Sequence, residues 1–370
     1  MRAPGAGAHG SADVPPPGAE RPAEHLPTTE GTMATTTRRR ASISDVARLA
    51  QVSVGTVSNV LNRPDRVAPA TRDRVLTAIT ELDFVPNGSA RQLRAGTITT
   101  AGAIVLDVAN PFFTDVARGI EDRLDEAGYT LMLASSDEDP EREARYLRLF
   151  EEHGVQGVMV VPATPDLAHL EAARARGLRV VLLDRPSPSD TLSSVAVDDR
   201  AGAAAATRHL LGLGHERLAF VNGSHSIRQC ADRAAGVRAA LAEGGLDPQT
   251  ALVEITIPSL NADGGQTGTQ QVLALNERPT AMLCVNDLTA LGALRALRAA
   301  DVPVPSGMAV VGYDDVAFAG ELATPLTSVR QPTHQLGHHA ADLLLRPDDA
   351  VEHVTFQPEL VIRESTTGTG

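Results

Sequence analysis

The sequence contains no lysine, so all 33 of its basic side chains are arginine. It contains only two cysteines, Cys230 and Cys284, too few for a disulfide framework, and this is typical of a protein of the reducing cytoplasm. We interpret both as small buried apolar side chains rather than nucleophiles. There is no run of eighteen apolar residues that would predict a membrane span, and no charged segment followed by an apolar one that would predict an export signal. We therefore expect a cytoplasmic protein that does not contact a membrane.

The motifs of several enzyme classes are also missing. There is no Gly-x-Ser-x-Gly nucleophile elbow and no phosphate-binding loop of the Walker type. His334 and His338 lie four residues apart on an expected helix, but no carboxylate or cysteine has the spacing that a metal site needs, so a solvated helix face is the better interpretation. The glycine pairs at 244–245 and 264–265 are expected to be turns. We predict that the protein is not an enzyme and uses no cofactor and no metal.

Charge is distributed unevenly along the chain. Residues 34–96 carry ten arginines against five acidic side chains, a net of +5, whereas the whole chain has a net charge of −13. Such a segment concentrates the attraction for phosphate in one small region of an acidic protein. The arginines at 38–40 form a basic arm that is expected either to contact phosphate or to remain solvated. Residues 1–40 are predicted to be a disordered tail, because they are rich in Pro, Gly, Ala and Thr and cannot bury enough apolar area. Met33 is a second candidate for the start of the chain.

Residues 42–62 are predicted to form two short helices joined by a tight turn. Ser42 can cap the first helix, with Asp45 as its reciprocal acid, and Ser53 can accept from the N–H groups that open the second. Three apolar residues are expected on the inward face of each helix. They are Val46, Leu49 and Ala50 in the first, and Val57, Val60 and Leu61 in the second.

The outward face of the second helix consists of small and amide side chains. These are Val54, Gly55, Ser58, Asn59 and Asn62. Such a face suits close approach to base edges, and asparagine can pair bidentately with adenine. The pattern alone is equally typical of a capped helical hairpin with a polar surface, so the neighbouring positive charge is what favours DNA binding.

A third helix and a short linker follow. Residues 69–82 are expected to be helical, with Val75, Leu76, Ile79 and Leu82 closing a small core against the first two helices. Residues 88–94 amount to about two helical turns, too short to be stable alone in water. We expect them to form a hinge that folds only against a partner.

From residue 97 onward, continuous apolar runs alternate with helical patterns. The runs are 103–106, 130–133, 157–161, 180–183, 218–221, 281–285 and 309–311. The main helical stretches are 114–127, 141–153, 201–211, 233–243 and 288–300. Continuous apolar runs are typical of parallel strands buried on both faces, so the fold class is α/β and doubly wound. About 265 residues favour two lobes with a cleft between them, and ligands bind such sheets at the carboxyl ends of the strands.

Many short motifs, in order from Ile43 to Glu364, resemble those of bacterial repressors of the LacI/GalR family. They include "ISDVARLA", "VSVGTVSNVLN", "PNGSARQLR", "ANPFF", "LLDRP", "VAVDDRAGA", "NDLTALGALRAL", "VVGYDD" and "PLTSVRQP". The resemblance implies an all-α helix-turn-helix headpiece at 41–86, a hinge helix at 87–97 and an effector-binding core at 98–365, two-lobed like periplasmic binding proteins. It divides the core into lobe 1, about 98–195 and 328–346, and lobe 2, about 196–327 and 350–365.

The same resemblance implies partners and site residues. It implies a homodimer bound to a near-palindromic operator in double-stranded DNA, and a small polar effector, a sugar or sugar derivative, that switches operator affinity. The residues that it assigns to DNA are Ser53, Val54, Gly55, Thr56, Ser58, Asn59, Asn62, Arg91 and Leu93, with Leu93 as a wedge in the minor groove. Those that it assigns to the effector are Asn110, Phe112, Phe113, Asp184, Arg233, Leu260, Asn286 and Asp314.

This chain departs from the family pattern at three positions. Gln51 stands at a turn position where the family usually has glycine, and a left-handed conformation there would cost about 1 kcal/mol. Ala68 replaces a capping serine before Pro69, at a cost of about 1 kcal/mol. Leu260 stands where relatives often place an aromatic ring, so either the ligand differs or Phe112 and Phe113 stack on it. The main alternative function is a solute-binding protein of a transport system, whose core would look the same.

Overall fold

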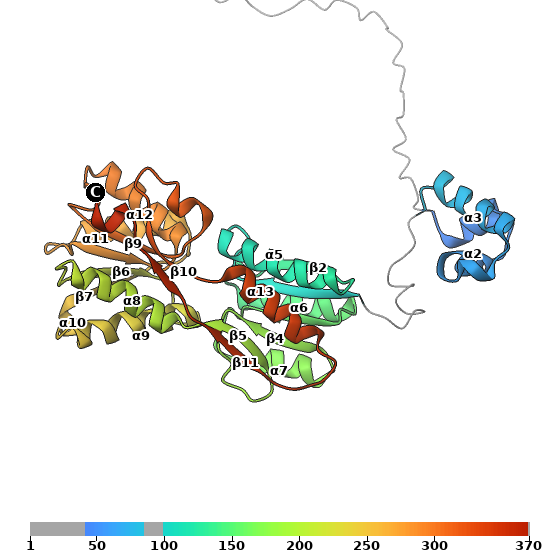
Figure 1. The fold of residues 1–370 in the computed structure, drawn as a ribbon, viewed down its shortest axis with the longest axis horizontal. Helices are drawn as coiled ribbons and strands as arrows, with labels where there is room; N and C mark the ends of the chain where they lie inside the picture. Colours follow the sequence, from blue (N-terminus) through green and yellow to red (C-terminus); the bar gives the residue numbers. More distant parts are fainter. Residues whose placement is uncertain (1–40, 85–98, 369–370) are drawn as a thin grey trace, which may run out of the picture. The chain divides into compact units, whose positions relative to one another are not determined.

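The computed structural model describes residues 41–84 and 99–368, which belong to two compact units. The first unit contains the helical headpiece and the second contains a core of two lobes (Figure 1). Arg91 and Leu93, to which we assigned DNA contacts, lie outside the described residues, as do the predicted tail and hinge.

The headpiece consists of short helices whose starts are set by side-chain caps. They are α1 (Ile43–Leu49), α2 (Val54–Asn62), the 3-10 turn η1 (Pro64–Arg66) and α3 (Pro69–Glu81). Ser42 and Asp45 form the predicted capping box, and Ser53 accepts a hydrogen bond from the Thr56 N–H group at 3.1 Å. Ala68 supplies no side-chain cap to α3. Gln51 adopts the left-handed conformation that the family comparison implied, with φ of 54°.

A small core of valine and alanine holds the three helices together. Val46, Val57 and Val75 are fully buried in it. Two of our inward assignments were wrong, because Leu49 and Leu76 are 46% and 47% exposed. In each helix the buried face is centred about one residue away from the face that we predicted. An alanine, Ala47 in α1 and Ala78 in α3, therefore lies on the buried face, and the leucine lies outside it.

Lobe 1 is a six-stranded sheet in which all neighbouring strands are parallel, in the order β11-β5-β4-β3-β1-β2. Helices α5 and α13 cover one face, and α6 and α7 cover the other (Figure 1). The strands are β1 (Thr100–Val105), β2 (Thr130–Ser135), β3 (Gly157–Val160), β4 (Arg179–Leu183), β5 (Ser193–Val197) and β11 (His353–Phe356). The helices are α5 (Pro111–Glu126), α6 (Pro140–Glu152), α7 (Ala168–Ala175) and α13 (Thr333–Leu345).

Lobe 2 repeats this plan in the order β12-β10-β9-β8-β6-β7, but its edge strand β12 is antiparallel to β10. Helices α8 and α9 cover one face, and α11 and α12 cover the other. The strands are β6 (Leu218–Asn222), β7 (Leu252–Thr256), β8 (Ala281–Cys284), β9 (Ala309–Asp314), β10 (Thr327–Arg330) and β12 (Glu359–Val361). The helices are α8 (Asp199–Gly212), α9 (Arg228–Glu243), α10 (Pro248–Ala251), α11 (Ala262–Leu273), α12 (Asp287–Ala299) and α14 (Glu364–Thr367), with the 3-10 turn η2 (Ala317–Gly320).

The chain passes between the lobes three times, after β5, after β10 and after β11. This differs from the lobe boundaries that we predicted. Strand β10 pairs with β9 and so belongs to lobe 2, although we had assigned residue 328 onward to lobe 1. Strand β11 pairs with β5 and so belongs to lobe 1, although we had assigned residues 350–365 to lobe 2. Each of these strands lies next to a point where the chain passes from one lobe to the other. The sequence of so short a strand does not indicate which sheet it joins.

The prediction of a turn at the glycine pair 264–265 is also wrong, because the pair lies inside α11. A Cβ atom on Gly265 would collide with the carbonyl oxygen of Thr289 in α12, and one on Gly292 of α12 would collide with that of Ala262. The two helices therefore pack closely because these residues lack side chains. Gly244 and Gly245 do form a turn, where Gly245 has φ of 78°. Among the described helices, none is long and apolar enough to cross a membrane.

Candidate functional site

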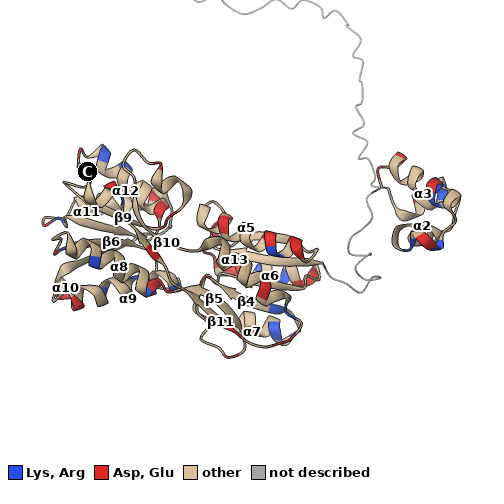
Figure 2. Ribbon diagram, in the orientation of Figure 1, with Lys and Arg blue, Asp and Glu red and all other residues tan. Residues whose placement is uncertain are grey.

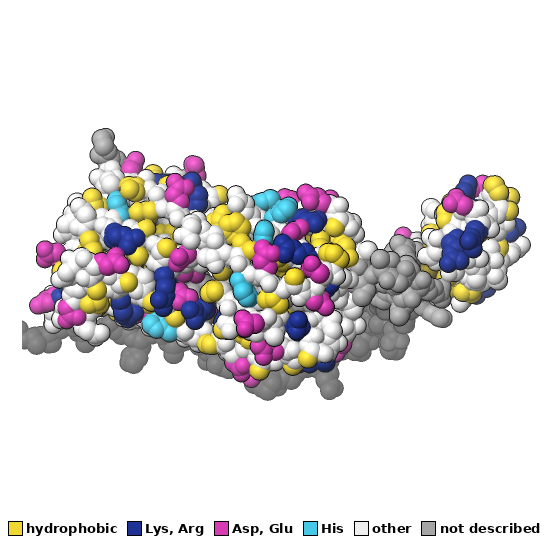
Figure 3. Space-filling model, turned by 60° about the horizontal axis from the view of Figure 1, so that its bottom comes forward, with side chains coloured by type: hydrophobic (Ala, Val, Ile, Leu, Met, Phe, Trp, Pro, Cys, Tyr) yellow, Lys and Arg dark blue, Asp and Glu magenta, His cyan; other side chains and the backbone are white. Residues whose placement is uncertain are grey.

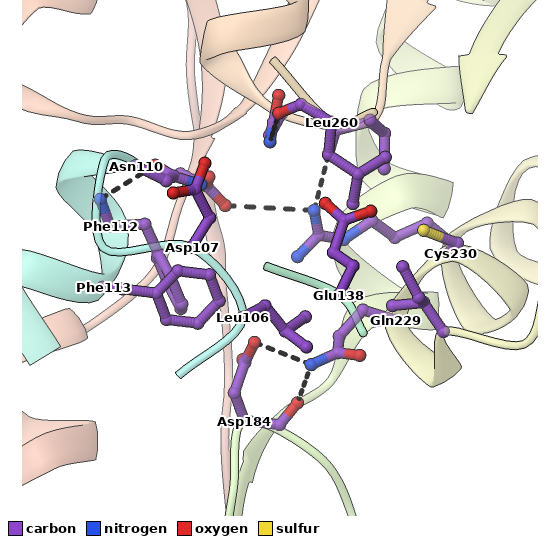
Figure 4. A pocket seen from close by; sticks show the side chains of 15 residues that line it. Leu106, Asp107, Asn110, Phe112, Phe113, Glu138, Asp184, Gln229, Cys230 and Leu260 are labelled. Atoms are coloured by element: carbon purple, nitrogen blue, oxygen red, sulfur yellow. Dashed lines mark hydrogen bonds and ion pairs between the residues drawn. The ribbon is translucent and has the colours of Figure 1, made fainter. Parts of the chain in front are cut away.

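A pocket lies between the two lobes, at the carboxyl ends of the strands of both sheets (Figure 4). It encloses about 470 Å³ of space that is free of protein atoms, part of it open to solvent. Its lining comes from both lobes. The residues are Leu106, Asp107, Asn110, Phe112, Phe113, Glu138 and Asp184 of lobe 1, and Ile227, Gln229, Cys230, Arg233, Leu260, Val285, Asn286 and Asp314 of lobe 2.

Lobe 1 contributes an aromatic pair and a carboxylate. Asn110 caps α5 by accepting from the Phe112 N–H group at 3.0 Å, which places both phenylalanines in the first helical turn. The rings of Phe112 and Phe113 meet edge to face, with centroids 4.9 Å apart, and both are buried. Asp184 directly follows β4 in a left-handed conformation, with φ of 56°. Such a conformation is rare outside glycine and aspartate or asparagine, and it turns the chain sharply at the pocket.

Lobe 2 contributes a buried charged cluster around Arg233. Its Nε donates to Asp199 Oδ1 at 2.7 Å, and its Nη1 donates to the Val285 carbonyl at 2.5 Å. Asp314 Oδ1 lies 3.9 Å from Nη1, and the guanidinium stacks 3.6 Å from the centroid of the Tyr313 ring. Arg233 therefore meets anionic, carbonyl and aromatic partners at once, which is the set that fits a planar guanidinium. The cluster fixes the orientation of Arg233 before any ligand enters.

Burial determines the electrostatics of the carboxylates in the pocket. It raises the pKa of Asp314 to about 7, against the opposing effects of Arg233 and Gln331. It also raises the pKa of Asp184 well above its usual value, with Asp199 acting in the same direction, and raises that of Glu138. For Arg233, burial lowers the pKa, but Asp199 and the other anionic neighbours outweigh it, so the pKa is raised and the guanidinium stays charged.

Two asparagines line the pocket with amide groups that already have protein partners. Asn286 caps α12 by accepting from the Thr289 N–H group at 2.8 Å, and its Nδ2 donates to the Leu260 carbonyl at 2.9 Å. Asn110 caps α5 in the same way. Both side chains therefore position helix starts at the edge of the pocket, whatever else they contact.

A hydrogen-bonded bridge between two side chains connects the lobes across the pocket. Gln229 Nε2, in the first turn of α9, donates to Asp184 Oδ2 at 2.8 Å and to the Asp184 carbonyl at 2.7 Å. Both residues are buried. Opening the cleft would separate these groups, so their pairing is a direct contact between the two halves of the site.

All eight residues that we assigned to the effector line this one pocket. The sequence analysis missed the other seven. Asp107 and Glu138 come shortly after β1 and β2, so their positions at strand ends carried a signal that we did not use. Gln229 and Cys230 lie one helical turn before Arg233, and the helical period alone could have found them. Leu106, Ile227 and Val285 had no sequence signal beyond being apolar.

The predicted DNA-reading face lies on α2. Val54, Gly55 and Asn59 are exposed there, whereas Val57 and Val60 are buried. The remaining assigned residues bond within the helix: Ser53 Oγ lies 2.9 Å from Thr56 Oγ1, and Asn62 Nδ2 donates to the Ser58 carbonyl at 2.8 Å. Helix α2 itself carries no charged side chain. It therefore presents methyl and amide groups outward, as direct reading of base edges needs.

The positive charge of this region is placed differently from what we expected. Within residues 41–84, five arginines face five acidic side chains, so the described headpiece has no net charge (Figure 2). The net of +5 in residues 34–96 comes from the arginines at 38–40, 91 and 94, which lie outside the described residues. On the face shown in Figure 3, acidic and basic side chains are interspersed over the core.

Together, a headpiece with an exposed, uncharged second helix and a two-lobed core with a polar cleft define a ligand-responsive DNA-binding regulator. Comparisons with known proteins agree. Residues 42–87 match the family of bacterial regulatory proteins, lacI family, and residues 99–360 match periplasmic binding proteins and sugar binding domain of LacI family. The chain is 34% identical over 330 residues to the HTH-type transcriptional repressor PurR of Photobacterium profundum, covering 88% of this chain and 98% of that protein.

Solved structures point the same way. A complex of the transcriptional regulator CelR with cellobiose has a TM-score of 0.65 at 31% identity, and the match covers 88% of this chain and 100% of that one. The lac repressor dimer bound to operator and the anti-inducer ONPF has a TM-score of 0.72 at 28% identity, covering 89% and 99%. The chain belongs to the LacI family, and it is a DNA-binding transcriptional regulator with an effector-binding core.

Proposed function

We propose that the protein is a cytoplasmic repressor that binds a near-palindromic operator as a homodimer and is switched by a sugar bound between the lobes of its core. The observation that carries this proposal is the pocket itself. It collects all eight assigned residues from both lobes, and the hydrogen bond from Gln229 to Asp184 joins the lobes across it. A ligand placed there contacts both lobes, so it can favour one relative arrangement of the lobes over another.

DNA recognition in this proposal rests on α2. Asn59 pairs with an adenine edge, Val54 contacts a thymine methyl group, and Gly55 leaves room for the close approach. Ser53, Thr56, Ser58 and Asn62 stiffen the helix or contact phosphates. Leu93 and Arg91 act in the hinge segment, with Leu93 in a minor-groove step, by family resemblance.

The switch follows from linkage. A ligand changes operator affinity only through its different affinities for the DNA-competent and DNA-incompetent arrangements of the lobes. In a dimer, a change in lobe arrangement changes the spacing of the two hinge segments. That spacing decides whether both hinges fold in the minor groove at once.

The experiment is to select DNA from a random pool with the purified full-length chain and then measure its affinity with and without sugars. We expect enriched sequences with two related half-sites, and at least one sugar that changes the affinity. Asn59→Ala should alter the base selected at one position per half-site and cost about 1–3 kcal/mol. The matched control is Thr77→Ala on α3, an exposed residue whose hydroxyl bonds to the Asp73 carbonyl. A pool without enrichment would contradict the proposal and favour a solute-binding protein, the alternative that the core alone permits.

A further inference from the structure

The loop between β6 and α9 leads into one wall of the pocket. It spans residues 223–227, and the first turn of α9 that follows it contributes Gln229 and Cys230 to the lining (Figure 4). Among the described residues no side chain caps the start of α9, in contrast to α5 and α12. Helix ends without a cap fray easily, so other contacts must fix the position of this turn.

Asn222, the last residue of β6, ties the two ends of the loop together. Its side chain is fully buried. Its Oδ1 accepts from the Gly223 N–H group at 2.9 Å, and its Nδ2 donates to the Cys230 carbonyl at 3.1 Å and to Glu254 Oε1 at 2.8 Å. A carboxylate can only accept, so Glu254 determines which end of the amide group faces it. The orientation of Asn222, and with it the closure of the loop, therefore depends on Glu254.

Glu254 accepts from three elements at once. It lies on the edge strand β7, and its side chain is 14% exposed. Its Oε1 also accepts from Nε2 of His225, a residue of the loop, at 2.7 Å, and its Oε2 pairs with Arg238 of α9. Burial raises the pKa of this carboxyl group, but the bonds from Asn222, His225 and Arg238 outweigh it, so the pKa is lowered and the group stays charged. One carboxylate thus holds the end of β6, the loop and α9 together.

The loop in turn packs against the pocket. A Cβ atom on Gly223 would lie 2.5 Å from Cδ2 of Leu260 and 2.9 Å from Sγ of Cys230, so the backbone of the loop lies close to both side chains. Both of these residues line the pocket. Glu254 itself lies outside the pocket, so its effect on a ligand must pass through the loop and α9.

We propose that Glu254 is a positioning residue of the effector site, which holds loop 223–227 and the first turn of α9 where Gln229 reaches Asp184 and Cys230 stays covered. The inference rests on the proposed function, because it assigns a role in effector binding to a residue outside the pocket. Without the charge of Glu254 the loop is released and the turn moves. The effector is then bound more weakly, while the headpiece and the sheets of the core keep their structure.

The two cysteines of the chain provide a readout that needs no ligand. Cys230 lies beside the loop and Cys284 at the end of β8, and both are buried. Burial raises the pKa of Cys230 to about 12, so iodoacetamide reacts with it only when the surrounding structure opens. Cys284→Ala leaves Cys230 as the single thiol, and Cys230→Ala leaves Cys284. The two labelling rates then compare opening at the loop with opening elsewhere in lobe 2.

Glu254→Gln in the Cys284→Ala chain should raise the labelling rate of Cys230 by about tenfold or more, because it weakens hydrogen bonds to a charged group. The same substitution in the Cys230→Ala chain should leave the rate of Cys284 unchanged. Glu243→Gln, at the exposed end of α9 where it pairs with Arg208 at 3.1 Å, is the matched control and should change neither rate. An unchanged rate at Cys230, or an equal increase at both cysteines, would overturn the inference.

His225→Ala keeps the inference testable if Glu254→Gln does not fold. The side chain of His225 is 50% exposed, so its removal leaves the core intact and takes one bond from the loop. The labelling rate of Cys230 should rise by about threefold, with no change at Cys284. The same rate as in the unsubstituted chain would contradict the inference.

Ligand binding separates this inference from the proposed function. Operator affinity of the full-length wild type, Glu254→Gln and Glu243→Gln is measured against ribose, glucose and cellobiose. A sugar that changes the affinity of the wild type should be needed at about tenfold higher concentration by Glu254→Gln, and at the same concentration by Glu243→Gln. An equal requirement in all three chains would overturn the role in effector binding. If none of the sugars acts on the wild type, the proposed sugar response is contradicted, whereas the labelling rates still decide whether Glu254 holds the loop.

Discussion

Helix α2 of the headpiece and the pocket of the core use charge in opposite ways. Helix α2 carries no charged side chain, and its exposed groups are small side chains and amides. The pocket holds four carboxylates and one arginine in a largely buried setting. In the proposed function, the groups of α2 that read bases are therefore uncharged, whereas several of the groups that contact the effector are ionisable.

The difference predicts which parts of the function respond to salt. Salt should screen the attraction between arginines and DNA phosphates, because these charges face solvent. It should not screen the buried network around Arg233. With roughly 6–10 phosphate contacts, operator affinity should fall by about 10³–10⁵ between 50 and 200 mM salt. Ligand affinity should change little over the same range. Fluorescence anisotropy measures the DNA affinity and calorimetry measures the ligand affinity. The same dependence on salt for both affinities would contradict the difference between headpiece and core.

The arginines at 38–40 offer a way to sharpen this comparison. Replacing all three by glutamine should reduce the slope of log affinity against log salt by about 3, because each phosphate contact contributes about 0.9. The sequence preference should stay the same, because phosphate contacts carry no base information. The matched control is a triple variant of the core, with Arg174, Arg295 and Arg298 all replaced by glutamine. An unchanged slope in the first variant would mean that the arm stays solvated.

Arg233 tests the core side of the comparison. Arg233→Met should abolish the ligand response and cost about 3–5 kcal/mol of stability, because it leaves Asp199 buried without its partner. Arg200→Met is the control, since its side chain is 66% exposed and it lies 3.4 Å from Asp232. DNA binding without ligand should persist in both. Denaturant unfolding and anisotropy give the two readouts, and a stable, responsive Arg233→Met variant would contradict the role of the cluster.

Stability should also depend on pH through the pocket. Because the pKa of Asp314 is raised to about 7 from an ordinary value near 4, the native state binds a proton that the unfolded state releases. The stability of the ligand-free chain should therefore fall as pH rises from about 4 to about 7 and level off above that. Asp314→Asn should flatten part of this decline, and Asp137→Asn, on the surface, should not. If the stability of the wild type instead rose between about pH 4 and pH 7, and Asp314→Asn gave the same dependence on pH, the raised pKa of Asp314 would be contradicted.

The smallest effect is expected in the headpiece. Ala68→Ser should add about 1 kcal/mol to headpiece stability by supplying the missing cap of α3. Ala70→Ser, two residues on and inside α3, is the control and should not stabilise. Circular dichroism melting of the isolated headpiece would show whether the cap acts as proposed.

The parts of the fold and of the pocket that could be predicted from the sequence are those that neighbouring residues determine. The caps at Ser42 and Ser53 and the strand runs were predictable because neighbouring residues determine them. The pocket residues followed from strand ends and family motifs. The bridge between Gln229 and Asp184 was not predictable, because the two residues are 45 apart in sequence and lie on different lobes. The exposure of Leu49 and Leu76 was missed because short helices leave the centre of the buried arc uncertain by one residue.

The central claim is that the headpiece with its flanking arginines binds DNA and the core binds the ligand. The most direct measurement compares the full chain with a fragment that begins at residue 96, using DNA selected by the full chain and a sugar that stabilises it. The account predicts that the fragment still melts cooperatively and responds to the sugar, but binds the selected DNA at least about 10³-fold more weakly. Equal DNA affinity of the fragment and the full chain would contradict the claim.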